Sequence, residues 1–172
     1  MLNRLVVLDQ RLSQQLAQLA EPRLWLRRTA SVFAHSGDSP LWLIGLGLTL
    51  WLGSNFWRFE AGVDLVGMAI TAVVVQVIKW RVKRPRPPGQ WGQGYRRLDP
   101  HSFPSGHAAR AVMLATVAGF WGPAGWAALL IAWALLVLLA RVIMRVHYLS
   151  DVVVGGLCGL VCGVGLGLAL RF

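Results

Sequence analysis

Three groups of ionisable residues lie beside long uncharged stretches of this sequence, and their side chains are of the kinds that enzymes use in catalysis. The first group is a basic run that includes Lys79 and Arg86, and the second is Pro-Ser-Gly-His at residues 104–107. The third group consists of Arg141, His147 and Asp151. Charged groups next to apolar membrane spans are energetically costly, so their presence favours a functional role.

The third group has the spacing of a histidine that is oriented by a carboxylate. Asp151 follows His147 by four residues, and side chains four positions apart are neighbours on a helix. A carboxylate that holds one ring nitrogen fixes the tautomer and leaves the other nitrogen with a lone pair. We therefore expect His147 to act as a nucleophile or a base, with Asp151 as the group that orients it.

The second group predicts the start of a helix that could bind an anion. Pro104 and Ser105 are typical of a helix N-terminus, and a small Gly106 would expose backbone N–H groups to an anion. His107 would lie beside that anion, in the first helical turn. Considered alone, such a histidine is more often a structural hydrogen-bonding residue, and the basic run over 79–87 could be a patch that contacts lipid headgroups.

The composition predicts that lipid surrounds much of the chain. The sequence is 56 % hydrophobic and 14 % charged, whereas soluble domains carry about 25 % charged residues. Its net charge of +10 suits anionic headgroups or phosphate, and no nucleic-acid motif is present. A membrane span needs about 20 mainly apolar residues. The uncharged stretches with their turns predict five spans, over residues 40–57, 61–79, 105–121, 124–146 and 149–170.

We expect a single all-α domain over residues 1–172, an integral membrane helical bundle of about five transmembrane helices. Residues 1–37 are predicted to form amphipathic helices in the membrane interface, or else to pack on a partner subunit. Residues 38–172 would form the transmembrane core, with an active-site loop over 80–104. Four glycines spaced by four residues would let another helix approach closely, which makes this ridge a candidate contact for a homo-oligomer. They are Gly155, Gly159, Gly163 and Gly167.

Alternating spans would bring the three groups to one membrane face. Lys79 ends the second predicted span, His107 begins the third, and Arg141 ends the fourth. His147 precedes the fifth span. Two histidines, a carboxylate and several cations at one face indicate phosphoryl chemistry, because cations hold phosphate oxygens and offset the charge of the transition state.

Together the groups resemble the motifs of the type 2 phosphatidic acid phosphatase family, which shares its site with vanadium haloperoxidases. The first family motif is Lys, six residues and Arg-Pro, matched by Lys79, Arg86 and Pro87. The second is Pro-Ser-Gly-His, matched by residues 104–107. The third is Ser-Arg, five residues, His, three residues and Asp. It is matched by Arg141, His147 and Asp151, with Ala140 in place of the family serine.

The resemblance implies a phosphatase that needs no metal and no cofactor. His147 would form a phosphohistidine, Asp151 would orient it, and His107 would protonate the leaving oxygen and then act as a base. Phosphate oxygens would be bound by Lys79, Arg86, Ser105, Gly106 and Arg141. Ala140 removes one hydroxyl donor, which would weaken phosphate binding by about 1 kcal/mol and leave the catalytic groups intact.

The expected substrate is a membrane lipid with a terminal phosphate or diphosphate, such as phosphatidic acid, phosphatidylglycerol phosphate or a polyprenyl diphosphate. Apart from the three motif cations, twelve basic residues fall on the site face against Arg58 and Arg171 on the other. The positive-inside rule then places the site at the cytoplasmic face of the inner membrane. Two alternatives remain open: a phosphotransferase that uses an acceptor other than water, and a non-enzymatic transporter or haem-binding protein that uses His107 and His147 as axial ligands.

Overall fold

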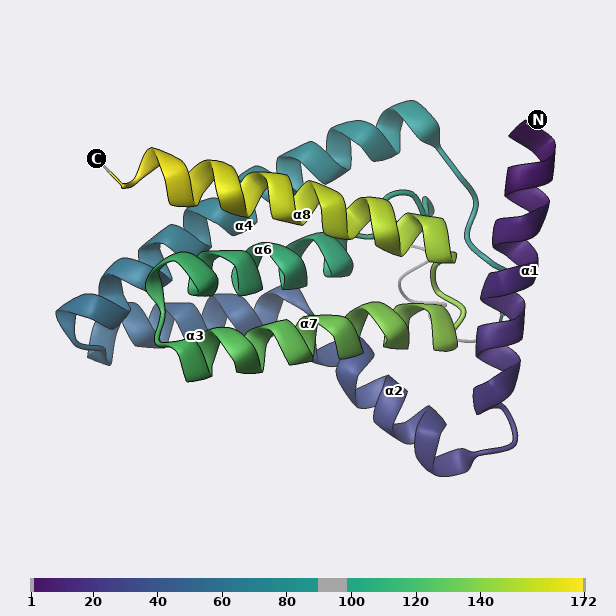
Figure 1. Cartoon of the computed structure of the whole chain (residues 1–172), viewed down its shortest axis with the longest axis horizontal. Helices are drawn as coiled ribbons and strands as arrows, with labels where there is room; N and C mark the ends of the chain where they lie inside the picture. The colour runs from purple at the N-terminus through teal and green to yellow at the C-terminus, as the bar shows by residue number, and fades with distance from the viewer. Residues whose placement is uncertain (1, 90–98, 172) are drawn as a thin grey trace.

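The computed structural model describes residues 2–89 and 99–171, and its regular elements are α-helices (Figure 1). Seven helices lie in these residues: α1 (Leu2–Ala20), α2 (Leu24–Ser36), α3 (Ser39–Leu52), α4 (Asn55–Val82), α6 (Gly106–Trp121), α7 (Ala124–Ile143) and α8 (Leu149–Ala169). This architecture confirms the predicted all-α class. Part of the predicted active-site loop 80–104, namely residues 90–98, lies outside the described residues.

Three of the helices, α4, α7 and α8, are long and apolar enough to cross a membrane. The other two apolar helices, α3 and α6, are shorter, although α6 closely matches the span predicted over residues 105–121. Helix α3 has 14 residues and α6 has 16. At 1.5 Å per residue α6 is about 24 Å long, which is less than the roughly 30 Å of the hydrocarbon core.

The boundary between α3 and α4 also differs from the prediction. We expected the first span to run to residue 57, but α3 ends at Leu52 and α4 begins at Asn55. The chain turns at Gly53, where a Cβ atom would lie only 2.4 Å from the carbonyl oxygen of Thr49. The prediction relied on the absence of charge over residues 40–57 and passed over Gly53, Ser54 and Asn55, which are typical turn residues.

Helix α6 lies at the centre of the bundle and packs against α4, α7 and α8 (Figure 1). Its small side chains allow this close packing, and Ala108, Ala109 and Ala111 are fully buried. Further along, Met113 and Leu114 join a core cluster with residues of α3 and α4. The helix that bears His107 is therefore held on several sides by protein.

The four glycines of the predicted ridge in α8 form the contact with α6 and its N-cap residue Ser105. A Cβ atom on Gly155 would lie 2.4 Å from the carbonyl oxygen of Ser105, and one on Gly159 would lie 2.0 Å from that of Ala109. All four glycines are buried within the chain. The ridge does bring another helix close, but that helix is α6 of the same chain, so the homo-oligomer expected through the ridge loses its contact surface.

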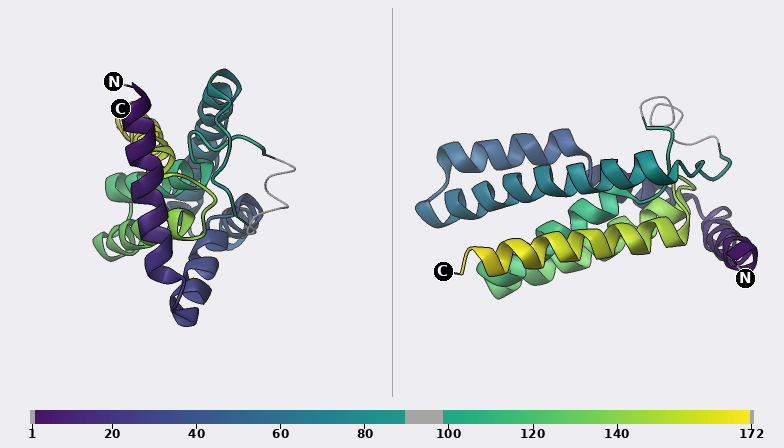
Figure 2. Two further views of the ribbon diagram at one scale, coloured as in Figure 1. Left: turned by 90° about the vertical axis from the view of Figure 1, so that its right-hand side faces the viewer. Right: turned by 90° about the horizontal axis from the view of Figure 1, so that it is seen from above.

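Helix α1 lies across one end of the bundle (Figure 2), and α2 packs beside the C-terminal part of α7. On α1, Ser13, Ala17 and Ala20 are buried against the bundle, whereas Leu5 and Leu12 are exposed. An exposed apolar stripe fits a helix that lies in the membrane interface, and the interfacial location of residues 1–37 stays a prediction.

Candidate active site

The three predicted groups meet at the end of the bundle that α1 covers (Figure 1). Lys79 lies in the last turn of α4, and Arg141 in the last turn of α7. His107 lies in the first turn of α6, and Asp151 in the first turn of α8. The backbone N–H of Ser105 donates to the carbonyl oxygen of Asp151 over 2.9 Å, which joins the second group directly to the third.

His147 lies in the short connection between α7 and α8 and is 2 % exposed. Its Nδ1 atom donates to the carbonyl oxygen of Ser102 over 2.8 Å, so Nε2 carries the lone pair in the neutral ring. Burial and the positive charges of Arg141, Arg86 and Lys79 hold the pKa of His147 well below its usual range. The ring is therefore a neutral imidazole whose Nε2 lone pair lies among cations.

Asp151 is a neighbour of His147, as the spacing predicts, but it does not make the expected hydrogen bond. Its Oδ2 atom is 3.6 Å from Nδ1 of His147, beyond hydrogen-bonding distance. Oδ2 instead accepts from the backbone N–H of Tyr148 over 2.8 Å, which caps α8. The carbonyl oxygen of Ser102, rather than a carboxylate, fixes the tautomer of His147, and Asp151 holds the backbone that carries the ring.

Two of the predicted phosphate-binding cations already hold an anion. The Oδ2 atom of Asp99 accepts from Nζ of Lys79 and, over 3.0 Å, from Nη2 of Arg86. Nη1 of Arg86 also lies 3.1 Å from Nε2 of His147. Lys79 is 3 % exposed and Arg86 is 8 % exposed. The carboxylate of Asp99 thus lies where the two cations could bind a phosphate oxygen beside the His147 ring.

Ser105 and Gly106 stand at the N-terminus of α6, as the sequence predicts. The hydroxyl oxygen of Ser105 accepts from the backbone N–H of Ala108 over 3.4 Å and so caps the helix. Such an N-terminus favours an anion through its backbone N–H groups and the helix dipole. The capping bond accounts for the serine, whereas the contact of Ser105 and Gly106 with phosphate stays a prediction.

Arg141 is almost fully buried, at 1 % exposure, and its Nη1 atom donates to the carbonyl oxygen of Ala34 in α2 over 3.2 Å. The preceding Ala140 belongs to an apolar cluster with Ala30 and Ala34 of α2 and two residues that follow α7. These apolar neighbours account for an alanine where the family usually has serine. The effect of Ala140 on phosphate binding stays a prediction.

His107 has a partner that the motifs do not include. Its Nε2 atom lies 2.7 Å from Oδ1 of Asp38, which stands between α2 and α3. Asp38 is 69 residues away in the sequence, and nothing in its local pattern marks it. Its position directly before an apolar helix gives it the appearance of an ordinary helix cap.

Arg84 was also missed, although it lies inside the predicted basic run. Its Nη1 atom donates to Oδ1 of Asp151 over 2.7 Å, and its Nη2 atom donates to Oδ2 of Asp9 in α1 over 2.7 Å. Its guanidinium also lies 4.0 Å over the ring of Tyr148. Burial alone would raise the pKa of Asp9, but hydrogen bonds from Ser150 and Arg84 outweigh it and hold that pKa below its ordinary value. This network attaches α1 to the start of α8.

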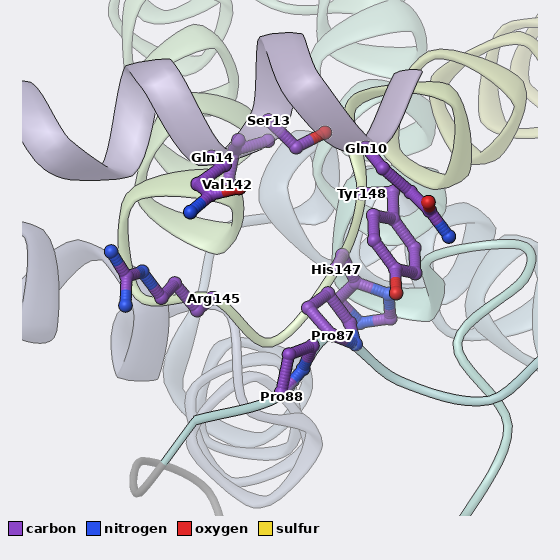
Figure 3. A pocket seen from close by; sticks show the side chains of 9 residues that line it. All are labelled: Gln10, Ser13, Gln14, Pro87, Pro88, Val142, Arg145, His147 and Tyr148. Atoms are coloured by element: carbon purple, nitrogen blue, oxygen red, sulfur yellow. The ribbon is translucent and has the colours of Figure 1, made fainter. Parts of the chain in front are cut away.

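A cavity of about 310 Å³ opens beside His147, between α1 and the α7–α8 connection (Figure 3). Figure 3 shows the side chains around it: Gln10, Ser13, Gln14, Pro87, Pro88, Val142, Arg145, His147 and Tyr148. Amide, hydroxyl and guanidinium groups share this lining with apolar rings. Residues of α1 therefore form one wall of a space next to the candidate nucleophile.

Within residues 2–89 and 99–171, no three His, Cys, Asp or Glu side chains come together as a metal site. Two carboxylates near His147, those of Asp99 and Asp151, are engaged by cations instead. The expectation of a reaction without metal or cofactor stays a prediction.

The fold and the site define a multi-pass helical membrane protein with two histidines, buried cations and a helix N-terminus gathered at one end. A model of the PAP2 superfamily matches residues 61–170, which contain all three motifs. The chain belongs to this superfamily.

Two solved structures share the fold. One is a transmembrane PAP2-type phosphatidylglycerolphosphate phosphatase from Bacillus subtilis, with 22 % identity and a TM-score of 0.76 over 95 % of this chain and 85 % of that one. The other is LpxE from Aquifex aeolicus, with 25 % identity and a TM-score of 0.70 over 91 % of this chain and 94 % of that one. The helical arrangement described above is thus similar to that of two bacterial proteins.

Proposed function

We propose that this protein is a lipid phosphatase in which Nε2 of His147 attacks phosphorus. The observation that carries the proposal is the state of this ring. It is neutral and buried, its Nδ1 proton is held by the carbonyl oxygen of Ser102, and its lone pair points toward Arg86. A neutral imidazole with a fixed tautomer is the form that a nucleophilic histidine requires.

In the first step the Nε2 lone pair forms a bond to phosphorus, and the bond from phosphorus to the lipid oxygen breaks. The electron pair of the broken bond stays on the lipid oxygen, which takes a proton from His107 and leaves as an alcohol. Lys79, Arg86 and Arg141 would hold the remaining phosphate oxygens, with the N-terminus of α6 as a further anion-binding group. These buried cations would offset charge that grows in the transition state.

In the second step a water molecule releases the phosphate. His107, now neutral, takes a proton from the water, whose oxygen bonds to phosphorus while the bond between phosphorus and Nε2 of His147 breaks. The electron pair returns to Nε2, and inorganic phosphate leaves. His107 then holds the proton that the next cycle needs.

The carboxylate of Asp99 supports the assignment of Lys79 and Arg86 to phosphate binding. Both cations donate to the same oxygen of Asp99, so their positively charged groups already converge on one anionic atom. A phosphate oxygen in that place would lie next to Nε2 of His147, because Arg86 also contacts that nitrogen. Substrate binding would then require Asp99 to move aside.

The substrate class follows from the place of the site at the end of a membrane bundle, next to the amphipathic helix α1. We propose a lipid with a terminal phosphate or diphosphate, of the phosphatidic acid, phosphatidylglycerol phosphate or polyprenyl diphosphate class. One of the two structural relatives is named as a phosphatidylglycerolphosphate phosphatase. The cavity beside His147 offers polar groups that suit a hydroxyl-bearing headgroup.

We further propose that the site faces the cytoplasm from the inner membrane. Basic residues of α1 and α2 lie at the site end, while Arg58 near the start of α4 and Arg171 after α8 lie at the other end. Lys83→Cys, in a background with Cys158 and Cys162 replaced by serine, offers a thiol at the site end. Efficient labelling in intact cells by a membrane-impermeant reagent would overturn this orientation.

The proposed function is tested by phosphate release from a panel of purified lipid phosphates in detergent micelles. The informative variant is His147→Asn, because its amide N–H can still donate to Ser102 while the nucleophilic nitrogen is gone. Turnover should fall by more than about 10³-fold. Arg28→Ala, a change at an exposed residue of α2, is the control and should keep wild-type turnover.

Wild-type turnover by His147→Asn would refute the nucleophile. Loss of the lipid phosphate without release of inorganic phosphate would instead indicate transfer to another acceptor.

A further inference from the structure

We infer that Asp38 is a positioning residue for His107, holding Nε2 of the imidazole so that Nδ1 exchanges the proton with the substrate. The inference rests on the proposed function, since it concerns how the acid of that reaction is oriented. Asp38 lies in the α2–α3 turn, outside all three motifs and outside the matched region 61–170.

The contact itself is short and well shielded. Oδ1 of Asp38 lies 2.7 Å from Nε2 of His107, and the side chain of His107 is 14 % exposed. A carboxylate accepts hydrogen bonds, so the proton of this contact lies on Nε2. Proton exchange with a leaving oxygen then falls to Nδ1, the other ring nitrogen.

The carboxylate of Asp38 does not serve the purpose that its sequence position suggests. Asp38 is the N-cap residue of α3, where an aspartate usually accepts from backbone N–H groups of the first turn. In this structure its side chain makes no such capping bond. Oδ1 is directed to His107, and Oδ2 lies 3.2 Å from Nδ1 of His35. The side chain is therefore turned away from its own helix and toward α6.

The turn that bears Asp38 is fixed against the helix that bears His107. Arg110, one helical turn after His107, donates to the carbonyl oxygen of Gly37. A Cβ atom on Gly37 would lie 3.2 Å from Cδ2 of His107, so the glycine lets the turn approach the imidazole. The indole N–H groups of Trp42 and Trp133 hold Ser36 at distances of 3.0 and 2.9 Å. A turn held in this way restricts where Oδ1 can lie.

The charges around His107 show what the carboxylate does. Burial and the positive charge of Arg141 lower the pKa of His107 to about 3, with Arg110 acting in the same direction and Asp38 opposing them. The neighbouring His147 is neutral. A bound phosphate would offset the charge of Arg141 and raise the proton affinity of His107. Asp38 supplies a negative charge at Nε2 of His107, whereas the phosphate would lie near the other ring nitrogen, Nδ1.

The step that depends on Asp38 is departure of the lipid alcohol. The proton leaves Nδ1 of His107 for the lipid oxygen as the bond from that oxygen to phosphorus breaks, and the Nε2 proton stays on the ring beside Asp38. Without the carboxylate, His107 would lose its proton more readily and its ring could turn. Alcohols with a high pKa depend on this proton, whereas an acidic phenol can leave without it.

The test compares two substrates in purified protein with Asp38→Asn and Asp38→Ser. Serine is a good N-cap residue for α3, so Asp38→Ser removes the carboxylate while it supports the fold. On an alkyl lipid phosphate, kcat should fall by about 10- to 100-fold in both variants, with a much smaller loss on 4-nitrophenyl phosphate. The alkaline limb of the kcat profile should move to lower pH, because His107 then holds its proton less tightly. Asp38→Glu, which keeps the charge, should recover part of the loss, and Arg28→Gln, at an exposed residue of α2, should keep the wild-type profile.

Equal losses on the two substrates, or an unchanged alkaline limb, would overturn the role of Asp38 while wild-type turnover through His147 remained intact. An absence of phosphate release by the wild-type protein itself would overturn the proposed function and the inference with it. The pH profiles of the wild-type protein and of each variant are compared on the same substrate, so the ionisation of that substrate affects both profiles equally.

Discussion

Arg84 gives the sharpest test of how the candidate site is held together, because one guanidinium connects α1 with the start of α8. It donates to Asp151 at the start of α8 and to Asp9 in α1, each over 2.7 Å. Arg84→Met keeps much of the length and the apolar stem of the side chain and removes the charge. Any loss then reports on the contacts of the guanidinium, with the two carboxylates and with the Tyr148 ring, rather than on packing volume.

The burial of the three groups sets the size of the effect. The side chain of Asp151 is 0 % exposed, that of Asp9 is 13 % exposed and that of Arg84 is 18 % exposed. Removal of one partner of a buried ion pair costs about 3–5 kcal/mol, because the other charge stays buried without compensation. The partial exposure of Arg84 admits some water, so we expect a loss near the lower end, about 3 kcal/mol.

The assay is the free energy of unfolding of the purified protein in detergent micelles, measured for Arg84→Met, Asp9→Asn and the double variant. Residues in one ionic network are coupled by about 0.5–3 kcal/mol. The double variant should therefore be more stable than the sum of the two losses indicates. Arg81→Met, the same substitution at an exposed residue of the same basic run, is the matched control.

A loss for Arg84→Met within about 0.5 kcal/mol of the Arg81→Met value would refute the reasoning, since that is the range of ordinary surface changes. Strict additivity of Arg84→Met and Asp9→Asn would also contradict a network that joins α1 to α8.

Three further predictions concern packing, the phosphate site and pH. Gly159→Ala should destabilise the protein by about 2 kcal/mol through overpacking, because its Cβ atom would lie 2.0 Å from a backbone oxygen of α6; Gly165→Ala, with open space around it, should be neutral or stabilising in the same unfolding assay. Asp99→Asn should strengthen inhibition by inorganic phosphate by about threefold or more, because it removes the carboxylate that competes for the two cations; an unchanged inhibition constant would argue against a shared site. The pKa of His147 is lowered by burial and neighbouring cations. Stability should therefore fall as the pH drops below about 6.5, because the unfolded chain takes up a proton there that the folded protein does not. In a series of melting temperatures against pH, His147→Asn should remove that part of the fall.

The motifs and the span topology were sufficient to predict which residues gather at one end of the bundle. Lys79, His107 and Arg141 each lie at a helix end, and alternating helices must bring those ends together. The fold class could also be predicted, because long apolar stretches indicate helices that span a membrane. The boundary between α3 and α4 was missed, because the absence of charge over residues 40–57 conceals the turn at Gly53, Ser54 and Asn55.

The partners of the two histidines could not be predicted. The partner of His147 is the backbone carbonyl of Ser102. Every residue has a backbone carbonyl, so no motif can mark this one. The partner of His107 is Asp38, whose local sequence is that of a helix cap. Arg84 was visible as a cation, but its contact with Asp9 depends on where α1 lies, and an amphipathic pattern does not fix that position.

The glycine ridge of α8 has a mechanical consequence. Gly155 and Gly167 stand twelve residues apart, about 18 Å along the helix, and both rest directly on α6. The two contacts together fix the tilt of one helix on the other, so a larger side chain at Gly167 would pivot α8 about its contact at Gly155. The pivot would alter the gap between the His147 segment and the first turn of α6, where a shift of about 1 Å can slow catalysis about 100-fold. A residue at the far side of the membrane bundle would then behave, in a kinetic screen, like a residue of the active site.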